Sequence, residues 1–197
     1  MKKVFKFLVV AALSLFIGGV ANAQIKLGVS PGIQIPVGDF GDFYKLGFGG
    51  GINGEYLVTE NIGVGLNVGY YTFKGKEFDL GFDLDFGDDF EMDFDMSFGA
   101  ERINIIPITL NGKYYFTTEG FQPYGGVDAG LYMLNSSFGG ASNTDMYFGV
   151  APVLGFQYGF TDALALDLNA KYNLIFSEGS TTSTLGFNVG IVFAFGK

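Results

Sequence analysis

Hydrophobic and polar residues alternate along almost the whole chain, and this period of two predicts β-strands rather than helices. Between residues 62 and 70, for example, Ile62, Val64, Leu66, Val68 and Tyr70 alternate with Gly63, Gly65, Asn67 and Gly69. Eight segments of this kind are predicted at about 25–37, 45–58, 62–70, 105–116, 121–134, 146–158, 164–174 and 185–195. Each has one large apolar face and one face of small or polar residues, so we expect an all-β chain of eight antiparallel strands.

The connections between these segments are predicted to alternate in length. Short turns are expected at 59–61, 117–120 and 159–163, and longer connections include polar segments at 135–145 and 177–183. In an up-and-down barrel with an even strand number, this order places all short turns at one end and all long loops at the other. The pattern is typical of small outer-membrane barrels with a periplasmic N-terminus.

Aromatic residues gather near both ends of the predicted strands and indicate two girdles at the membrane interfaces, although aromatics are also simply common in strands. The set near the short turns is Tyr56, Tyr114, Tyr115, Phe116, Phe121, Tyr124, Phe156, Tyr158, Phe193 and Phe195. The set near the long loops is Tyr70, Tyr71, Tyr132, Tyr147, Phe148 and Phe176.

Period alone does not say which face of the sheet is outside. A soluble up-and-down barrel of the lipocalin kind, with its large apolar face inside, is therefore the competing architecture. Such a barrel needs many Lys and Glu on its outer face, whereas the second face here is mostly Gly, Asn, Ser and Ala. We expect the apolar face to contact lipid and the small polar face to fill a narrow lumen, with closure pairing every backbone group.

Six charged residues fall on the predicted lumen face: Lys26, Glu55, Lys113, Asp128, Asp167 and Lys171. Charges inside a barrel must be paired or solvated, so a compact ion-pair network that plugs the lumen is the expected arrangement. A ring of charges that lines a narrow conduit and selects ions is the alternative.

The segment 74–102 is longer than the other connections and alternates acidic with large apolar residues. This period predicts a hairpin that extends the third and fourth strands beyond the membrane. We expect it to bind an extracellular protein by strand addition, or an apolar ligand. The candidate residues are Phe78, Phe82, Asp83, Asp85, Phe86, Asp88, Asp89, Phe90 and Phe94. A solvated acidic loop is the simpler alternative, and calcium binding by its aspartates is another, although their spacing fits no EF-hand loop.

The N-terminus has the order of a secretory signal: a basic start, an apolar stretch from Phe7 to Val20 and the small residues 21–23. We expect residues 1–23 to be removed, which leaves one domain at 24–197. The apolar stretch is short for a transmembrane helix, which needs about 20 apolar residues. An uncleaved membrane anchor is the alternative.

Composition excludes several classes of function. The chain has no Cys and no His, so thiol nucleophiles, Ser-His-Asp triads and the usual zinc sites are absent, and we expect no enzyme and no cofactor. The net charge is −9, and loss of Lys2, Lys3 and Lys6 with the signal makes it −12. Nucleic acid is therefore not an expected partner.

The last predicted strand ends in the pattern Asn188, Gly190, Phe193 and Phe195. This pattern resembles the terminal signal by which outer-membrane barrels are handed to the barrel-assembly machinery. The Gly196-Lys197 end departs from the usual termination on the aromatic residue itself.

Two internal segments, 106–116 and 122–130, resemble the central strands of the small outer-membrane β-barrel or porin-family proteins, whose architecture is that of the OmpA, OmpX and OmpW barrels. The resemblance covers residues 24–197 and implies an eight-stranded barrel in the outer membrane of a diderm (Gram-negative) bacterium. It carries over no catalytic or binding residue. A structural or surface-interaction role is the expected function. The alternative is a narrow channel for small hydrophobic or ionic solutes, as suggested for OmpW-like barrels.

Overall fold

The computed structural model describes residues 24–76, 78–85, 91–98, 102–138, 141–177 and 179–196. Its elements are β1 (Ile25–Val37), α2 (Asp39–Phe43), β2 (Gly47–Leu57), β3 (Ile62–Lys74), β4 (Phe78–Asp85), β5 (Glu91–Phe98), β6 (Arg102–Tyr115), β7 (Phe121–Phe138), β8 (Ala141–Thr161), β9 (Leu164–Ser177) and β10 (Ser180–Phe195). Within these residues, no helix has the length and apolar character to cross a membrane.

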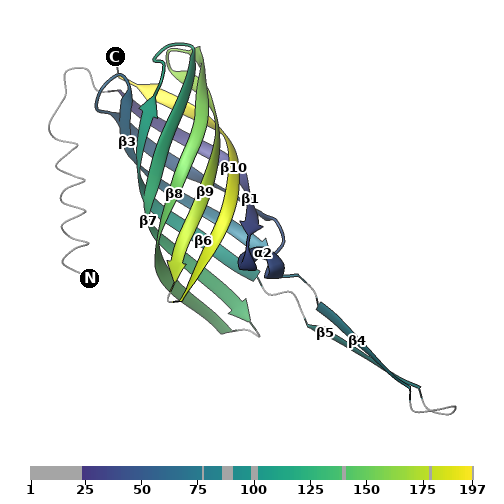
Figure 1. Cartoon of the computed structure of the whole chain (residues 1–197). Helices are drawn as coiled ribbons and strands as arrows, with labels where there is room; N and C mark the ends of the chain where they lie inside the picture. Colours follow the sequence, from purple (N-terminus) through teal and green to yellow (C-terminus); the bar gives the residue numbers. More distant parts are fainter. Residues whose placement is uncertain are drawn as a thin grey trace.

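Eight of the strands form one closed antiparallel barrel, in the order β1-β10-β9-β8-β7-β6-β3-β2 (Figure 1). The first and last strands close it, with Ile25 opposite Phe195 and Val37 opposite Ser183. Every neighbouring pair in the barrel is consecutive along the chain except β1–β10 and β3–β6, and the latter are separated by the β4–β5 hairpin. The predicted eight-stranded up-and-down barrel is therefore confirmed.

The large apolar face of each strand is outside. Leu66 of β3 is 47% exposed and Leu154 of β8 is 70% exposed, whereas Asn111 of β6 and Asn188 of β10 are buried. Because a narrow barrel leaves little room, long inner side chains lie over glycines on neighbouring strands. A Cβ atom at Gly63 would lie 2.5 Å from Glu55 Oε1, and one at Gly149 would lie 2.6 Å from the Tyr132 ring.

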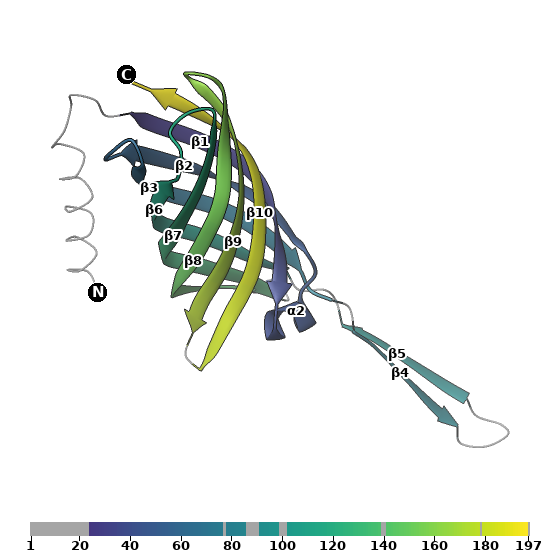
Figure 2. The same cartoon turned by 45° about the horizontal axis from the view of Figure 1, so that its top comes forward.

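The two ends of the barrel differ (Figure 2). The turns β2–β3, β6–β7 and β8–β9 lie at one end, which we call the short-turn end, together with Gln24 and Phe195. The helix α2 and the β4–β5 hairpin lie at the opposite, long-loop end. The short turns fall where the sequence predicts them.

Two connections at the long-loop end are shorter than the sequence predicts. The predicted polar loop 135–145 is mostly strand, because β7 continues to Phe138 and β8 starts at Ala141. The predicted connection 177–183 is shortened in the same way, since β9 continues to Ser177 and β10 starts at Ser180. The polar residues pair across the strands, as when Asn135 Nδ2 donates to Thr144 Oγ1 at 2.8 Å. Polarity alone therefore did not mark the end of a strand here.

The predicted aromatic girdles are only partly present. Tyr114, Phe121, Phe193 and Phe195 are about half exposed at the short-turn end, and Tyr70, Phe148 and Phe176 at the long-loop end. Tyr71, Tyr115, Tyr124 and Tyr132 are instead 8%, 1%, 2% and 2% exposed and lie inside the lumen. Assigning these four to the girdles was wrong, because their depth in the strand was considered without their face.

Candidate functional site

The structure places all six charged residues predicted for the lumen on the inner face of the barrel. They come from β1 (Lys26), β2 (Glu55), β6 (Lys113), β7 (Asp128) and β9 (Asp167 and Lys171). Lys26, Glu55, Asp128 and Asp167 are at most 6% exposed. The side chains of Lys113 and Lys171 are 9% and 21% exposed. Six charges removed from water need partners to be tolerated.

The less exposed of the two ion pairs, Glu55–Lys113, lies near the short-turn end. Lys113 Nζ is 2.7 Å from Glu55 Oε2, and the Tyr115 hydroxyl donates to Glu55 Oε1 at 2.6 Å. The Lys113 ammonium also lies 4.9 Å from the centre of the Tyr124 ring. Glu55 thus reaches over β3 from β2 to two residues of β6: its Oε1 accepts a hydrogen bond, and its Oε2 faces the Lys113 ammonium.

Lys26 connects a second group at the same depth. Its Nζ donates to Gln157 Oε1 at 3.0 Å, and Gln157 Nε2 donates to Asp167 Oδ2 at 3.0 Å. Asp167 also accepts from the Tyr124 hydroxyl and from Asn169 Nδ2 at 2.6 Å. Lys26 lies 4.3 Å from the centre of the Tyr115 ring, which joins this group to the Glu55–Lys113 pair. Gln157 of β8 therefore relays between Lys26 of β1 and Asp167 of β9, two strands away in the barrel.

The middle of the lumen holds the second ion pair. Lys171 Nζ lies 2.6 Å from Asp128 Oδ2, which also accepts from Asn67 Nδ2 at 2.9 Å. Asn111 Nδ2 in turn donates to Asn67 Oδ1 at 3.1 Å. Strands β3, β6, β7 and β9 are thus connected through one carboxylate and two amides.

Between this pair and the long-loop end, uncharged side chains form hydrogen bonds inside the lumen. The Tyr71 hydroxyl donates to Asn188 Oδ1 at 2.8 Å, and Asn188 Nδ2 donates to Asn169 Oδ1 at 2.9 Å. Gln34 Oε1 accepts from Asn173 Nδ2 at 3.0 Å and from the Thr184 hydroxyl at 2.8 Å. The Tyr132 hydroxyl donates to Asn173 Oδ1 at 3.1 Å.

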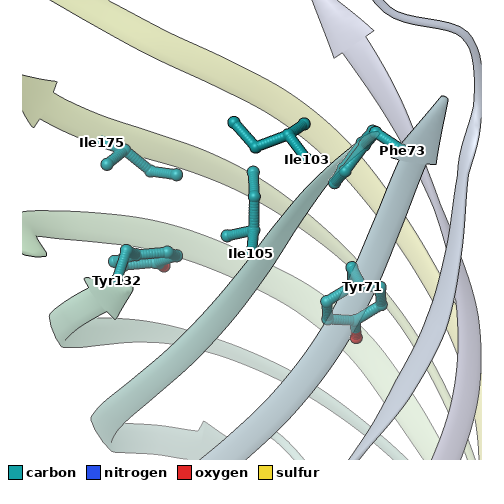
Figure 3. Close-up of a cluster of buried hydrophobic side chains, with 6 residues drawn as sticks. All are labelled: Tyr71, Phe73, Ile103, Ile105, Tyr132 and Ile175. Carbon is teal, nitrogen blue, oxygen red and sulfur yellow. The ribbon is translucent and has the colours of Figure 1, made fainter. Parts of the chain in front are cut away.

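An apolar cluster lies inside the barrel at the long-loop end. Figure 3 shows its six buried side chains: Tyr71, Phe73, Ile103, Ile105, Tyr132 and Ile175. The helix α2 covers this cluster, since the Phe40 ring packs edge-on to Phe73 with 5.3 Å between the ring centres. Lys76 Nζ holds α2 in place by donating to Gly41 O at 2.6 Å.

Between these layers the lumen retains a cavity of about 60 Å³, bordered by Asn67, Asp128, Lys171 and Asn188 among others. A volume of this size holds a few water molecules. The sequence predicts the amides for the lumen face but not their place in this network, and it assigns the four tyrosines to the girdles although their face was readable. Tyr115 has the same parity as Lys113, and Tyr71 the same parity as Asn67.

The residues predicted for the outer hairpin lie in or next to β4 and β5. Phe78, Phe82, Asp83 and Asp85 are in β4 and Phe94 is in β5. Phe86, Asp88, Asp89 and Phe90 lie outside the described residues. Strands β4 and β5 form a two-stranded antiparallel sheet apart from the barrel, which we call the ribbon.

The register of the ribbon sorts its residues by type. Phe78 pairs with Phe98, Leu80 with Met96, Phe82 with Phe94, and Leu84 with Met92. The alternate pairs are Asp79 with Ser97, Gly81 with Asp95, Asp83 with Asp93, and Asp85 with Glu91. Because alternate positions of a strand belong to opposite faces, one face carries only large apolar residues and the other is acidic.

The residues of the predicted assembly signal lie in β10. Asn188 and Gly190 are on the inner face, and Phe193 and Phe195 are on the outer face, 46% and 53% exposed. Among the described residues, no group of three or more acidic, His or Cys residues gathers where a metal ion could bind.

Comparisons with known proteins agree with this architecture. A family model described as outer membrane protein beta-barrel domain matches residues 8–195. Neisserial surface protein A is similar in structure, with 17% identity, a TM-score of 0.59, and coverage of 90% of this chain and 99% of that chain. The N-terminal barrel of Pseudomonas aeruginosa OprF is 15% identical, with a TM-score of 0.52 and coverage of 87% and 97%.

Yersinia pestis Ail, in a structure with the heparin analogue sucrose octasulfate, is 16% identical, with a TM-score of 0.50 and coverage of 88% and 98%. A search of curated proteins finds no match. At these identities the solved structures establish the fold alone. The family model covers nearly the whole chain, so this protein belongs to the outer membrane protein beta-barrel domain family.

Proposed function

We propose that this outer-membrane barrel is closed to solutes and serves as a rigid base for the ribbon at the cell surface. The observation that carries the proposal is the lumen, occupied by two ion pairs and bridging amides that leave a cavity of about 60 Å³. The apolar cluster and α2 add a second closure at the long-loop end. In this proposal the long-loop end faces outside and the short-turn end faces the periplasm.

Conductance in planar bilayers tests the closed lumen. The purified barrel is expected to give no steady single-channel currents. A variant with Tyr115→Ala and Tyr124→Ala removes two large rings buried inside the barrel and is the positive control for a pore. Steady currents from the unaltered protein would overturn the proposal and favour the narrow channel for small solutes.

We propose that the ribbon binds another surface protein through its apolar face, while its acidic face remains in water. Four apolar cross-strand pairs on one face exceed what a solvated loop requires. The similar barrel of Ail forms a complex with a heparin analogue. The ribbon here is acidic and would repel such a polyanion, so we do not assign it a sulfated ligand.

Two double variants separate the faces of the ribbon. Phe82→Ser with Phe94→Ser removes one apolar cross-strand pair, and Asp83→Asn with Asp93→Asn changes the neighbouring acidic pair. The first is expected to weaken binding of cells that display the protein to immobilised surface proteins by about tenfold or more, the loss typical of a buried aromatic anchor. The second is the matched control. Unchanged binding after deletion of 78–98 would remove this role.

We further propose that residues 1–23 are cleaved on export and that β10 is read by the barrel-assembly machinery. Outer-membrane fractionation with boiled and unboiled gel samples tests the export route, since closed barrels often migrate differently when heated. Replacing Phe193 and Phe195 with Ser should lower the amount of heat-modifiable protein in that fraction. Its full recovery would argue against the assembly signal.

A further inference from the structure

The exposed cations of this chain gather at one place. Beyond the signal segment, Lys26, Lys113 and Lys171 lie in the lumen, and Lys197 is the last residue. The remaining four are Lys45, Lys74, Lys76 and Arg102, all exposed and all at the long-loop end where β2, β3 and β6 meet. Within the described residues, the lipid-facing surface and the short-turn end carry none. In a chain whose net charge is −9, such a basic cluster calls for an explanation.

The backbone fixes this cluster. Lys45 N donates to Lys74 O at 2.8 Å, and Lys74 is the cross-strand partner of Arg102. Lys76 already donates to a carbonyl of α2. Lys74 and Arg102 therefore form the centre of the cluster, where β3 ends and β6 begins at the long-loop end of the barrel.

Lys74 and Arg102 are a like-charged pair placed directly opposite each other. Directly opposed residues in an antiparallel sheet have Cβ atoms roughly 4.5–5.5 Å apart, and like charges there are destabilising. Among the described residues neither makes a salt bridge, and the adjoining Glu77 and Glu101 lie outside those residues. A phosphate between the two cations would turn their repulsion into two attractive contacts, and a guanidinium can bind it with two hydrogen bonds.

From this pair toward the short-turn end, the residues on the outer face of the barrel change from polar to apolar in steps. Tyr71 and Phe73 of β3 are buried in the lumen, so Tyr70, Thr72 and Lys74 belong to the outer face. Thr72 pairs with Asn104, two positions from the Lys74–Arg102 pair toward the short-turn end. Tyr70, 52% exposed, marks the start of the lipid-facing band, which continues with the pairs Val68–Ile108 and Leu66–Leu110.

The spacing of these steps suits one lipid molecule. Lys74 is four positions after Tyr70, which is about 13 Å along the strand and about 10 Å along the membrane normal for a strand tilted by roughly 40°. The long Lys and Arg side chains can reach back toward the interface. A glycolipid would place its acyl chains on the apolar pairs, its sugar hydroxyls at Thr72 and Asn104, and a phosphate at the cations.

We propose that Lys74 and Arg102 bind a phosphate group of a phosphorylated glycolipid in the outer leaflet around the barrel. The inference rests on the proposed orientation, with the long-loop end outside. It adds a lipid site on the outer wall of the barrel, separate from the lumen and from the ribbon.

Titration calorimetry on the full chain, refolded in nonionic maltoside micelles, tests the site. The probes are bis-phosphorylated lipid A, the same lipid without phosphates, and inorganic pyrophosphate. Lys74→Gln with Arg102→Gln should weaken lipid A binding by about tenfold or more, since contacts to charged groups are the strong ones. Arg102→Lys should lose part of the affinity, because it retains the charge but not the paired hydrogen bonds.

Lys45→Gln is the matched control, since it removes one cation of the same cluster from outside the cross-strand pair and should leave most of the affinity. Phosphate-free lipid is expected to bind weakly. Pyrophosphate should not displace lipid A at equal concentration. Equal binding of all three probes, or a Gln double variant that binds lipid A like the unaltered chain, would overturn the proposal. Equal affinity for pyrophosphate alone would replace the membrane lipid with a soluble phosphate and also overturn it.

Thermal stability gives an independent sign. Without lipid A the double Gln variant should melt at the same temperature as the unaltered protein or higher, because the repulsion between Lys74 and Arg102 is gone. With lipid A it should melt lower, because the bound phosphate stabilises only the unaltered protein. If lipid A left the difference in melting temperature between the double Gln variant and the unaltered protein unchanged, the result would contradict the site. Neither readout depends on conductance or on ribbon binding, so this inference can fail while the proposed function stands.

Discussion

Removing one partner of the less exposed ion pair, Glu55–Lys113, tests whether water is excluded from the lumen. Glu55→Leu leaves Lys113 inside the barrel without its carboxylate, which lies 2.7 Å away. It also leaves the Tyr115 hydroxyl without its 2.6 Å acceptor. An uncompensated buried charge typically costs about 3–5 kcal/mol. An orphaned hydroxyl typically adds about 1–3 kcal/mol if it finds no water. We therefore expect the free energy of unfolding to fall by at least about 3 kcal/mol.

The matched variant removes all three polar groups together: Glu55→Leu, Lys113→Met and Tyr115→Phe. It should recover most of the loss, because replacing a buried ion pair with apolar residues of similar volume is often neutral. The cation–π contact of Lys113 with Tyr124 is also lost, so recovery to within about 2 kcal/mol of the unaltered protein is expected.

The assay is urea unfolding of the refolded barrel in lipid vesicles, analysed by linear extrapolation. The chain contains no Trp, so far-UV circular dichroism and unboiled gel migration are the suitable probes. A loss below about 1 kcal/mol for Glu55→Leu would mean that water reaches Lys113 freely. A triple variant no more stable than the single one would mean that the three groups are not one buried unit. Either result would refute the closed lumen.

Three further changes test other parts of the structure by the same unfolding assay, and the last of them also by limited proteolysis. Asp128→Leu should cost less than Glu55→Leu, because the Lys171 side chain is 21% exposed, whereas that of Lys113 is 9% exposed; an equal or larger cost would contradict this ranking. Gly149→Val should destabilise by about 1–3 kcal/mol through overpacking against Tyr132, whereas at Gly112 a Cβ meets nothing within 4 Å, so Gly112→Ala should be nearly neutral. Phe73→Ala should cost about 3–5 kcal/mol and expose the 39–46 connection to protease, since α2 packs on that ring; a protease-resistant variant would show that α2 is held by other contacts.

Strand periodicity was enough to predict the barrel and its faces. In β3 the alternation of Leu66 and Asn67 already separates a lipid side from a lumen side, and the structure follows it. A register slip of one residue would exchange the two faces of the whole strand. This is why a period of two is such a strong constraint in a two-faced sheet.

The contacts inside the lumen could not be predicted in the same way. Parity places Lys26 and Gln157 inside, but which side chains meet depends on the stagger of all eight strands around the barrel. The sequence predicts ion pairs, whereas Lys26 reaches Asp167 through Gln157. The strand ends at 135–145 were missed for a different reason. Beyond the membrane both faces of a strand are in water, so apolar alternation no longer reports the extent of pairing.

The bridges across the lumen join parts of the chain that are synthesised far apart. Lys26 and Gln157 are separated by 131 positions, and Gln34 and Asn173 by 139. Both bridges span β1 and the C-terminal strands, so they require β1 and β10 to be correctly placed. An incompletely closed intermediate would therefore hold charges without partners in a membrane, which is costly. We expect assembly to be all-or-none and slow, as is typical of folds dominated by non-local pairing.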